Sequence, residues 1–369
     1  MLKKHKILLI IMIILIFVSC SINAKGEVIE NLQIPIAFGV DVDTNCSTET
    51  YVISTLIQTF GDGGKASSDI ITSSGKTIGE ARQSRQLKSD KRFAFGLDRV
   101  FFLGDSACRY GLRTLMDINL NDPDLNDRAT CVVCKGNAKD MLKHKMKGQE
   151  NQAEYIEGMV KNLKEYNFFP QQYTIMDALV RIDSEGRNLL LPYIEFKDGD
   201  IQTTGLAVFN RDKMIGKANL EESKTINLLR ENNVKGIITL EKNQKKYMNF
   251  YATSKRKVKC YRENDKYKFV IDLKLEGFIL DNELFKNLYN DPAKIRELES
   301  DIASMAQKIC NETIYKIRDK YKTDILELGR VAAAKYGRKK GIDWNNVITN
   351  SNIKVNVSVK VNNQGRGDY

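Results

Sequence analysis

The chain begins with an uninterrupted apolar run between a basic start and a small-residue break. Residues 7–18 are all apolar and follow Lys3, Lys4 and Lys6. As a helix, these twelve residues would cover roughly 18 Å, which is too short for a hydrocarbon core of ~30 Å. A basic start, a short apolar segment and a small residue before a break are typical of an export signal. The pattern therefore predicts a signal peptide over residues 1–19.

The break itself, Val18-Ser19-Cys20, resembles the lipobox of bacterial lipoproteins, although Phe17 stands where the usual pattern has Leu. In such proteins the cysteine thiol takes a diacylglyceryl group, and cleavage makes that cysteine the first residue of the mature chain. We therefore predict Cys20 as a lipid attachment site that anchors the protein to a membrane, since two acyl chains anchor more firmly than one. The alternative is an ordinary secreted protein in which Cys20 only ends the apolar run.

Residues 20–148 alternate between β-type and helical patterns. Alternating apolar positions and short apolar runs predict strands over 34–43, 51–60, 99–103 and 130–134. Helical patterns cover 77–87, 106–116 and 138–146. The first of these helices opens with Thr77 and Glu80 at the spacing of a capping box. Strands that alternate with helices predict a layered α/β domain.

The pattern changes near residue 150. A small middle domain over 149–203 would hold two helices and a strand over 189–196. The C-terminal domain, 204–369, opens with a strand, turn and strand over 206–216, followed by a helix over 220–229. Its remaining strands are expected near 236–240, 248–253, 268–278 and 353–361.

Asp291-Pro292 predicts the start of the longest helix, because proline is favoured at the first helical position. Its apolar stripe is expected to pack on a sheet through Ile295, Leu298, Ile302, Met305 and Ile309. The fold class is therefore α+β: three domains with mixed and antiparallel sheets flanked by helices, and a long helix in the C-terminal domain.

Charge and cysteine content add little to this architecture. The net charge is +11, or +8 after loss of the three signal lysines. A basic, anchored protein is attracted to anionic lipid headgroups, whereas an exported protein would rarely meet nucleic acid. Six cysteines besides Cys20 are scattered, which predicts buried thiols rather than a disulfide framework: Cys46, Cys108, Cys131, Cys134, Cys260 and Cys310.

The sequence gives little support for catalysis. His5 and His144 are the only histidines, and His5 would be removed with the signal peptide, so a mechanism with a histidine base would have to use His144. Ser106 lies in a Gly-Asp-Ser block similar to that of GDSL esterases, which need an Asp-x-x-His pair near the C-terminus. Here no histidine follows His144, and Asp140 lies four residues before it. We predict no catalytic residue and no enzyme activity.

Metal and phosphate sites are not predicted either. Cys131 and Cys134 lack two further ligands for zinc, and on a strand their side chains would face opposite sides. The run Asp41-x-Asp43-x-Asn45 begins like a calcium loop but lacks its glycine and glutamate, since Cys46 and Val52 stand there. Gly61–Gly64 is a turn without the lysine of a phosphate loop. No cofactor is expected.

Four blocks of the mature chain resemble the Ger(x)C family, the lipoprotein C subunits of nutrient germinant receptors in bacterial endospores. They are residues 36–41, residues 131–142, residues 205–216, and the end of the chain from the long helix through Trp344 to the alternating valines. The chain departs from the family where Ser21-Ile22 and Lys217 replace frequent tryptophans.

The resemblance implies a non-enzymatic, three-domain lipoprotein on the outer face of the spore inner membrane. It would act with the polytopic A and B subunits of the receptor in sensing small nutrients, and it assigns no ligand-binding residue. Two alternatives stay open at this point. One is a solute-binding lipoprotein of a transporter, which would need two similar doubly wound lobes; the other is an exported hydrolase that uses Ser106.

Overall fold

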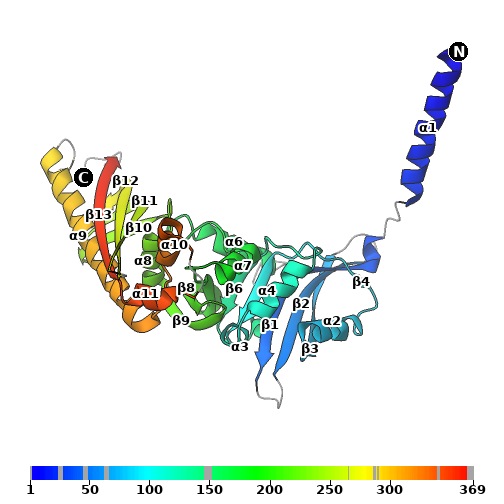
Figure 1. The fold of residues 1–369 in the computed structure, drawn as a ribbon, viewed down its shortest axis with the longest axis horizontal. Helices are drawn as coiled ribbons and strands as arrows, with labels where there is room; N and C mark the ends of the chain where they lie inside the picture. The colour runs from blue at the N-terminus through cyan, green and yellow to red at the C-terminus, as the bar shows by residue number, and fades with distance from the viewer. Residues whose placement is uncertain are drawn as a thin grey trace.

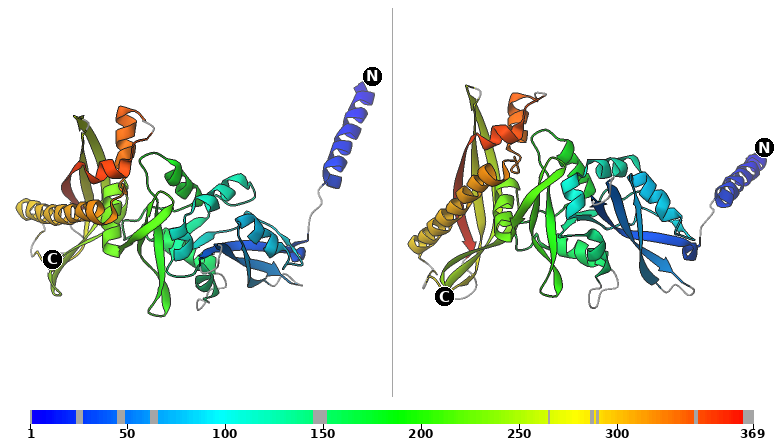
Figure 2. Two further views of the ribbon diagram at one scale, coloured as in Figure 1. Left: turned by 60° about the horizontal axis from the view of Figure 1, so that its bottom comes forward. Right: turned by 90° about the horizontal axis from the view of Figure 1, so that it is seen from below.

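The computed structural model describes residues 2–23, 28–44, 49–61, 66–144, 152–264, 266–285, 288, 291–338 and 341–363. The body is elongated, with a large sheet toward the N-terminal end and a smaller sheet with the longest helix at the other end (Figure 1). Helix α1, Leu2–Asn23, stands apart from this body in every view (Figures 1 and 2). Among the described residues, no helix combines the length and hydropathy that crossing a membrane requires.

The larger sheet has a parallel centre and antiparallel flanks. Its order is β3-β2-β1-β5-β6-β7-β8-β9, with β4 paired to β1. The strands are β1 Leu32–Asp43, β2 Thr50–Phe60, β3 Ala66–Gly75, β4 Arg92–Phe93, β5 Val100–Gly104, β6 Thr130–Cys134, β7 Leu190–Lys197, β8 Asp200–Asn210 and β9 Lys213–Asn219. β1, β5, β6 and β7 are parallel neighbours, whereas β1–β2 and β8–β9 are antiparallel. The predicted pairing of 34–43 with 51–60 is confirmed.

Short helices accompany this sheet: η1 Ile29–Asn31, α2 Ile78–Gln86, α3 Asp105–Tyr110, α4 Arg113–Asn121, α5 Ala138–Lys143, α6 Gln152–Asn162 and α7 Ile175–Asp183. α2 begins as predicted, because the Thr77 hydroxyl accepts a hydrogen bond from the Glu80 backbone N–H at 3.1 Å. The prediction of one helix over 106–116 is wrong. Gly111, at φ 134°, separates α3 from α4, since an α-helix cannot continue through that conformation.

The larger sheet takes strands from residues 32 to 219, and therefore from all three expected domains. The expected boundary between residues 203 and 204 falls inside β8. The division of the chain into three domains stays a prediction.

The smaller sheet has the order β10-β11-β12-β13. Its strands are β10 Lys235–Asn243, β11 Lys246–Glu263, β12 Lys266–Asn282 and β13 Asn352–Asn363. The last strand, predicted over 353–361, is confirmed and runs parallel to β12. Helices α8 Leu220–Arg230, α9 Pro292–Lys316, η2 Ile317–Tyr321, α10 Leu328–Tyr336 and α11 Trp344–Thr349 accompany it. The α+β fold class with mixed sheets is confirmed.

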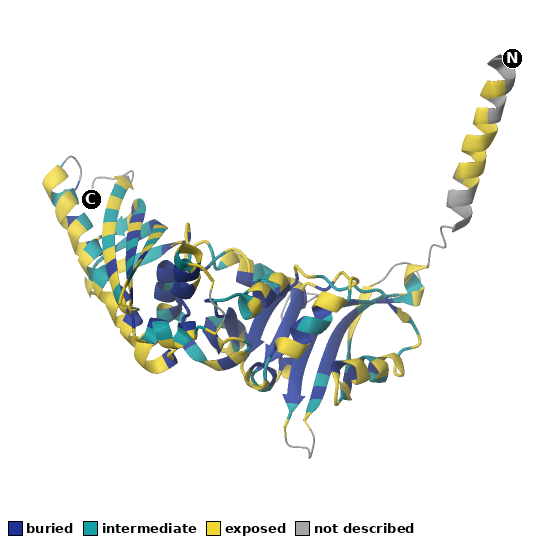
Figure 3. Ribbon diagram, in the orientation of Figure 1, coloured by how far each residue is buried: buried dark blue, intermediate teal, exposed yellow. Residues whose placement is uncertain are grey.

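The long helix α9 begins after Asp291, as predicted, and lies along the smaller sheet beside β13 (Figure 2). Its buried face differs in part from the predicted stripe. Ala306 and Cys310 are buried, whereas the side chain of Ile309 is 40% exposed. Buried residues of both sheets nevertheless belong to one connected core, and they alternate with exposed positions along the smaller sheet (Figure 3).

Candidate functional site

The C-terminal ends of the parallel strands are where ligands usually bind in open α/β sheets. Here that edge is occupied by the chain's own polar groups. The buried Asp41 carboxylate, at the end of β1, accepts hydrogen bonds from the backbone N–H groups of Ala138 at 2.8 Å and Lys139 at 3.1 Å. Burial raises the pKa of Asp41, and the two N–H groups oppose this rise. A Cβ at Gly104 would lie 1.9 Å from an Asp41 oxygen, so only glycine fits beside this carboxylate.

Asp105 and Ser106, at the start of α3, also connect neighbouring strand ends through side-chain hydrogen bonds. Asp105 accepts hydrogen bonds from the Gly136 N–H at 3.0 Å and from the Tyr193 hydroxyl at 3.1 Å. The Ser106 hydroxyl accepts the Val42 backbone N–H at 3.0 Å. The His144 ring, in contrast, stacks edge-on against Phe196, with ring centroids 4.4 Å apart. These contacts give Ser106 a structural role in joining α3 to β1.

A lysine occupies the position where the Ger(x)C pattern often has a second tryptophan. Lys217 on β9 forms an ion pair with Glu195 on β7, and its Nζ lies 4.7 Å from the centroid of the Tyr193 ring. Burial raises the pKa of Glu195, but hydrogen bonds from Lys217, Thr204 and Lys135 outweigh burial and lower it to about 2. At position 217, where the family often has tryptophan, this chain therefore has a lysine that makes an ion pair and a cation–π contact.

Cys131 and Cys134 are buried free thiols on β6, as predicted from the scattered spacing of the cysteines. Burial raises the pKa of both thiols, which keeps them protonated. The side chain of Cys20, at the end of α1, lies outside the described part of the chain, and so do Asn45, Cys46 and residues 62–64 of the predicted turn.

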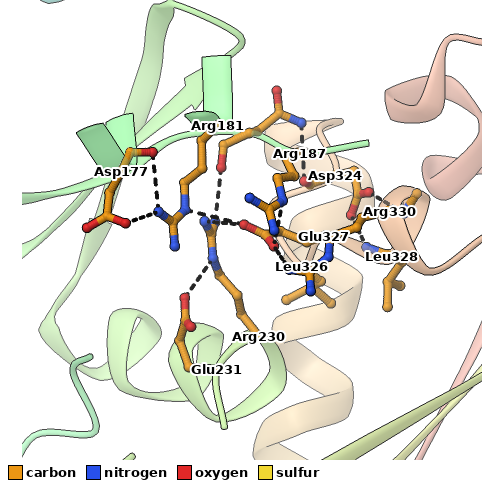
Figure 4. Close-up of polar contacts among 12 residues, drawn as sticks. Asp177, Arg181, Arg187, Arg230, Glu231, Asp324, Leu326, Glu327, Leu328 and Arg330 are labelled. Atoms are coloured by element: carbon orange, nitrogen blue, oxygen red, sulfur yellow. Dashed lines mark hydrogen bonds and ion pairs between the residues drawn. The ribbon is translucent and has the colours of Figure 1, made fainter. Parts of the chain in front are cut away.

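A second polar cluster lies where the two sheets meet, and we call it the Glu327 junction. Four arginines from different segments surround the Glu327 carboxylate (Figure 4). Their shortest nitrogen–oxygen distances to Glu327 are 2.9 Å for Arg230, 3.2 Å for Arg330, 3.3 Å for Arg181 and 3.4 Å for Arg187. Burial raises the pKa of Glu327, but the four guanidinium groups outweigh burial and hold the pKa below its ordinary value. Glu327 also has a left-handed backbone, with φ 56°.

Arg230 is the most deeply buried of the four, with 2% of its side chain exposed. It also donates hydrogen bonds to the backbone oxygens of Asn188 at 3.1 Å and Ile325 at 3.0 Å. Arg256, on β11, donates to the Leu326 oxygen at 3.0 Å, and burial lowers its pKa to about 10. Arginine therefore joins the smaller sheet, the loop before β7 and the segment before α10.

Asp324 fixes the turn that leads into α10. Its buried carboxylate accepts the backbone N–H groups of Leu328 at 3.0 Å and Gly329 at 2.6 Å. Burial raises the pKa of Asp324 to about 7, although both N–H groups oppose the rise. The Asn188 side-chain amide donates to the backbone oxygen of Asp324 at 3.2 Å and to the side-chain oxygen of Asn345 at 2.7 Å. These contacts can hold the larger sheet and the smaller sheet in one orientation relative to each other.

No residue of the Glu327 junction was predicted from the sequence. Its arginines come from three separate stretches of the chain, at residues 181–187, 230 and 330, and none of the four lies in a run of basic residues. Isolated charged residues are usually exposed, so no pattern in the sequence pointed to burial.

Comparisons with known proteins agree with the architecture of both halves. A family model described as "Spore germination protein N-terminal domain" matches residues 25–196, and "Spore germination B3/ GerAC like, C-terminal" matches residues 204–365. The chain therefore belongs to the Ger(x)C family of spore germinant receptor C subunits, which confirms the resemblance seen in its sequence.

Individual relatives match nearly the whole chain at low identity. The chain is 23% identical to "Spore germination protein GerQC" of Bacillus cereus, over 93% of this chain and 94% of the relative. It is 22% identical to "Spore germination protein B3" of Bacillus subtilis (strain 168), over 80% of each chain. The crystal structure of the GerBC protein shares the fold, with a TM-score of 0.59 at 17% identity, over 89% of this chain and 98% of that one.

Proposed function

We propose that this chain is the membrane-anchored, non-enzymatic C subunit of a nutrient germinant receptor. The observation that carries the proposal is the match to both germination-family regions, which follow the signal peptide predicted over residues 1–19 and the predicted lipid attachment site Cys20. The anchor would hold the chain on the outer face of the spore inner membrane. There it would assemble with the A and B membrane subunits.

A non-enzymatic role is supported by the contacts of the candidate catalytic groups. The Ser106 hydroxyl accepts a backbone N–H, and the Asp41 and Asp105 carboxylates accept hydrogen bonds from neighbouring loops. A nucleophile needs a base within hydrogen-bond reach, and the ring contact of His144 is with Phe196.

The alternative of a solute-binding lipoprotein is less well supported. Such a protein would have two similar doubly wound lobes, whereas the two sheets described here have different strand numbers and orders. We also propose that the Glu327 junction transmits movement between the two sheets, because its ion pairs and hydrogen bonds join segments that pack on both of them.

Germination of spores that lack this chain tests the proposal. Dipicolinate release is measured after amino acids, sugars and salts are added separately. We expect loss of the response to one nutrient class, restored by the wild-type chain and by the control Ser21→Ala but not by Cys20→Ala. Capture from spore membranes should recover the A and B subunits with the wild-type chain. Unchanged germination with every nutrient, or full rescue by Cys20→Ala, would contradict the proposal.

A further inference from the structure

The smaller sheet is covered by helices on one face only. Lys335 and Tyr336 of α10 donate hydrogen bonds to the Cys260 oxygen on β11, and the Trp344 ring of α11 contacts the Tyr267 ring on β12. Val355 on β13 is buried on the same side. Within the described ranges, the side chains that alternate with these residues point to the opposite face, where most are exposed. Other segments contact this face at its two ends, where Lys335 of α10 lies 5.2 Å from the centroid of the Tyr261 ring and the Tyr166 ring lies 5.8 Å from that of Tyr251.

The register of the strands brings many lysines together on this uncovered face. Lys255 pairs with Lys274, Lys257 with Asp272, and Glu276 with Lys360 across neighbouring strands. We call this surface the lysine face, and its eight exposed lysines are Lys255, Lys257, Lys259, Lys266, Lys268, Lys274, Lys354 and Lys360. Among the described residues of the three strands, the acidic residues at the corresponding positions are Glu263, Asp272, Glu276 and Asp281. The lysine face therefore still has an excess of positive charge.

Only part of this charge is neutralised within the chain. Lys255 and Lys274 share Glu276, and Lys259 pairs with Asp272 at 2.8 Å. The other five lysines form no ion pair among the described residues: Lys257, Lys266, Lys268, Lys354 and Lys360. They come from all three strands, so the uncompensated charge is spread over a surface rather than gathered in a pocket.

Aromatic side chains stand at both ends of the lysine face. Tyr261 is 43% exposed at one end, and Phe278 is 41% exposed at the other, where its ring lies 5.2 Å from that of Tyr251. Tyrosine and other amphipathic aromatic groups are enriched at the headgroup level of membranes. A broad, positive, open surface with aromatic ends fits an extended anionic surface better than it fits a small ligand.

We propose that the lysine face docks on anionic phospholipid headgroups and forms a second contact with the membrane. This inference rests on the proposed anchor at Cys20. The smaller sheet lies at the opposite end of the body from the start of β1, where the chain leaves the anchor (Figure 1). One anchor together with a basic surface gives more stable membrane attachment than either alone, and two distant contacts would lay the long axis along the bilayer.

Lysine acetylation of the full chain in vesicles tests the proposal. The full chain, as purified from membranes, is reconstituted in phosphatidylcholine vesicles with or without phosphatidylglycerol, treated with an acetylating reagent and digested for mass spectrometry. We expect several-fold slower modification of Lys257, Lys268 and Lys354 in the anionic vesicles, and recovery of the rate at high salt. Lys308, on α9 across the same sheet, and Lys213 are exposed controls whose rates should not change.

A charge-reversal variant separates specific docking from general attraction. In Lys257→Glu/Lys268→Glu/Lys354→Glu, the remaining Lys266 and Lys360 should lose their protection, whereas Lys213→Glu/Lys308→Glu should preserve it. Equal modification in neutral and anionic vesicles would overturn the proposal. So would protection that arises only when other spore membrane proteins are present, because it would indicate an acidic protein partner.

The mass of the Cys20 peptide in the same digest reports the anchor independently. An acylated chain whose lysines are not protected would overturn the proposed docking of the lysine face and leave the proposed anchor intact. An unacylated chain would overturn the anchor.

Discussion

At the scale of the residue, Glu327 is unusual because its single carboxylate forms ion pairs with four arginines. Its left-handed backbone shows that the surrounding contacts hold a conformation that an ordinary residue avoids. Arg181 and Arg230 also pair with Asp177 and Glu231, whereas the printed ion pairs of Arg187 and Arg330 are with Glu327 alone. Removing a buried carboxylate therefore leaves part of this positive charge without a partner, which costs more than the intact pair contributes to folding.

We therefore expect Glu327→Gln to lower the free energy of unfolding by about 3–5 kcal/mol. The control Arg330→Gln removes an arginine whose side chain is 56% exposed, and should cost below about 1 kcal/mol. Urea denaturation of both variants gives the comparison. Equal midpoints for Glu327→Gln and the wild type would show that the arginines find other acceptors.

At the scale of the element, α9 protects the open edge of the smaller sheet. Gln307 donates to the Val355 oxygen at 2.7 Å and accepts the Val357 N–H at 3.0 Å, and Glu299 accepts the Val361 N–H at 2.8 Å. Side chains of one helix thus satisfy three of the outward backbone groups of β13. Exposed edges of this kind otherwise invite pairing with other chains.

Replacing Gln307 by Leu should expose the edge of β13. We expect faster amide exchange in residues 352–363 and a loss of about 1–3 kcal/mol in stability, because two backbone groups lose their partners. Glu312→Gln, at an exposed position of the same helix, is the matched control. Exchange mass spectrometry measures both variants, and identical exchange in the two would refute a protective role for Gln307.

The elements also show what the sequence could predict. β1 was predictable as a short, mostly apolar run that is buried on both faces, and β13 was predictable from its alternating valines. β3 was missed because its residues, Ala66–Gly75, are mostly polar and partly exposed at the sheet edge. The Glu327 junction was also missed, because its partners meet only after both sheets have formed. Burial of Arg230 is a consequence of tertiary packing and leaves no periodic signal.

At the scale of the whole molecule, the two halves touch where two glycines cross. A Cβ at Gly186, before β7, would lie 2.4 Å from the backbone carbon of Gly329 on α10. The Arg330 N–H donates to the Gly186 oxygen at 3.1 Å, so the backbones are hydrogen-bonded at this crossing. Trp344, the single tryptophan of the chain, packs against Gly329 and donates to Glu185 at 2.8 Å. Its fluorescence should therefore report directly on the contact between the halves.

Gly186→Ala should force the halves apart, whereas Gly199→Ala provides the matched control. Both glycines have positive φ, 68° and 84°, but a Cβ at Gly199 would meet no atom within 4 Å. The control should cost about 1–2 kcal/mol for its backbone conformation alone. Gly186→Ala should cost about 2–5 kcal/mol, because overpacking is added to the same strain.

Urea unfolding followed by Trp344 fluorescence and by circular dichroism measures both. In Gly186→Ala the fluorescence transition should also precede the loss of secondary structure, since the junction would open first. Equal costs and coincident transitions in the two variants would mean that the glycine crossing does not hold the halves together.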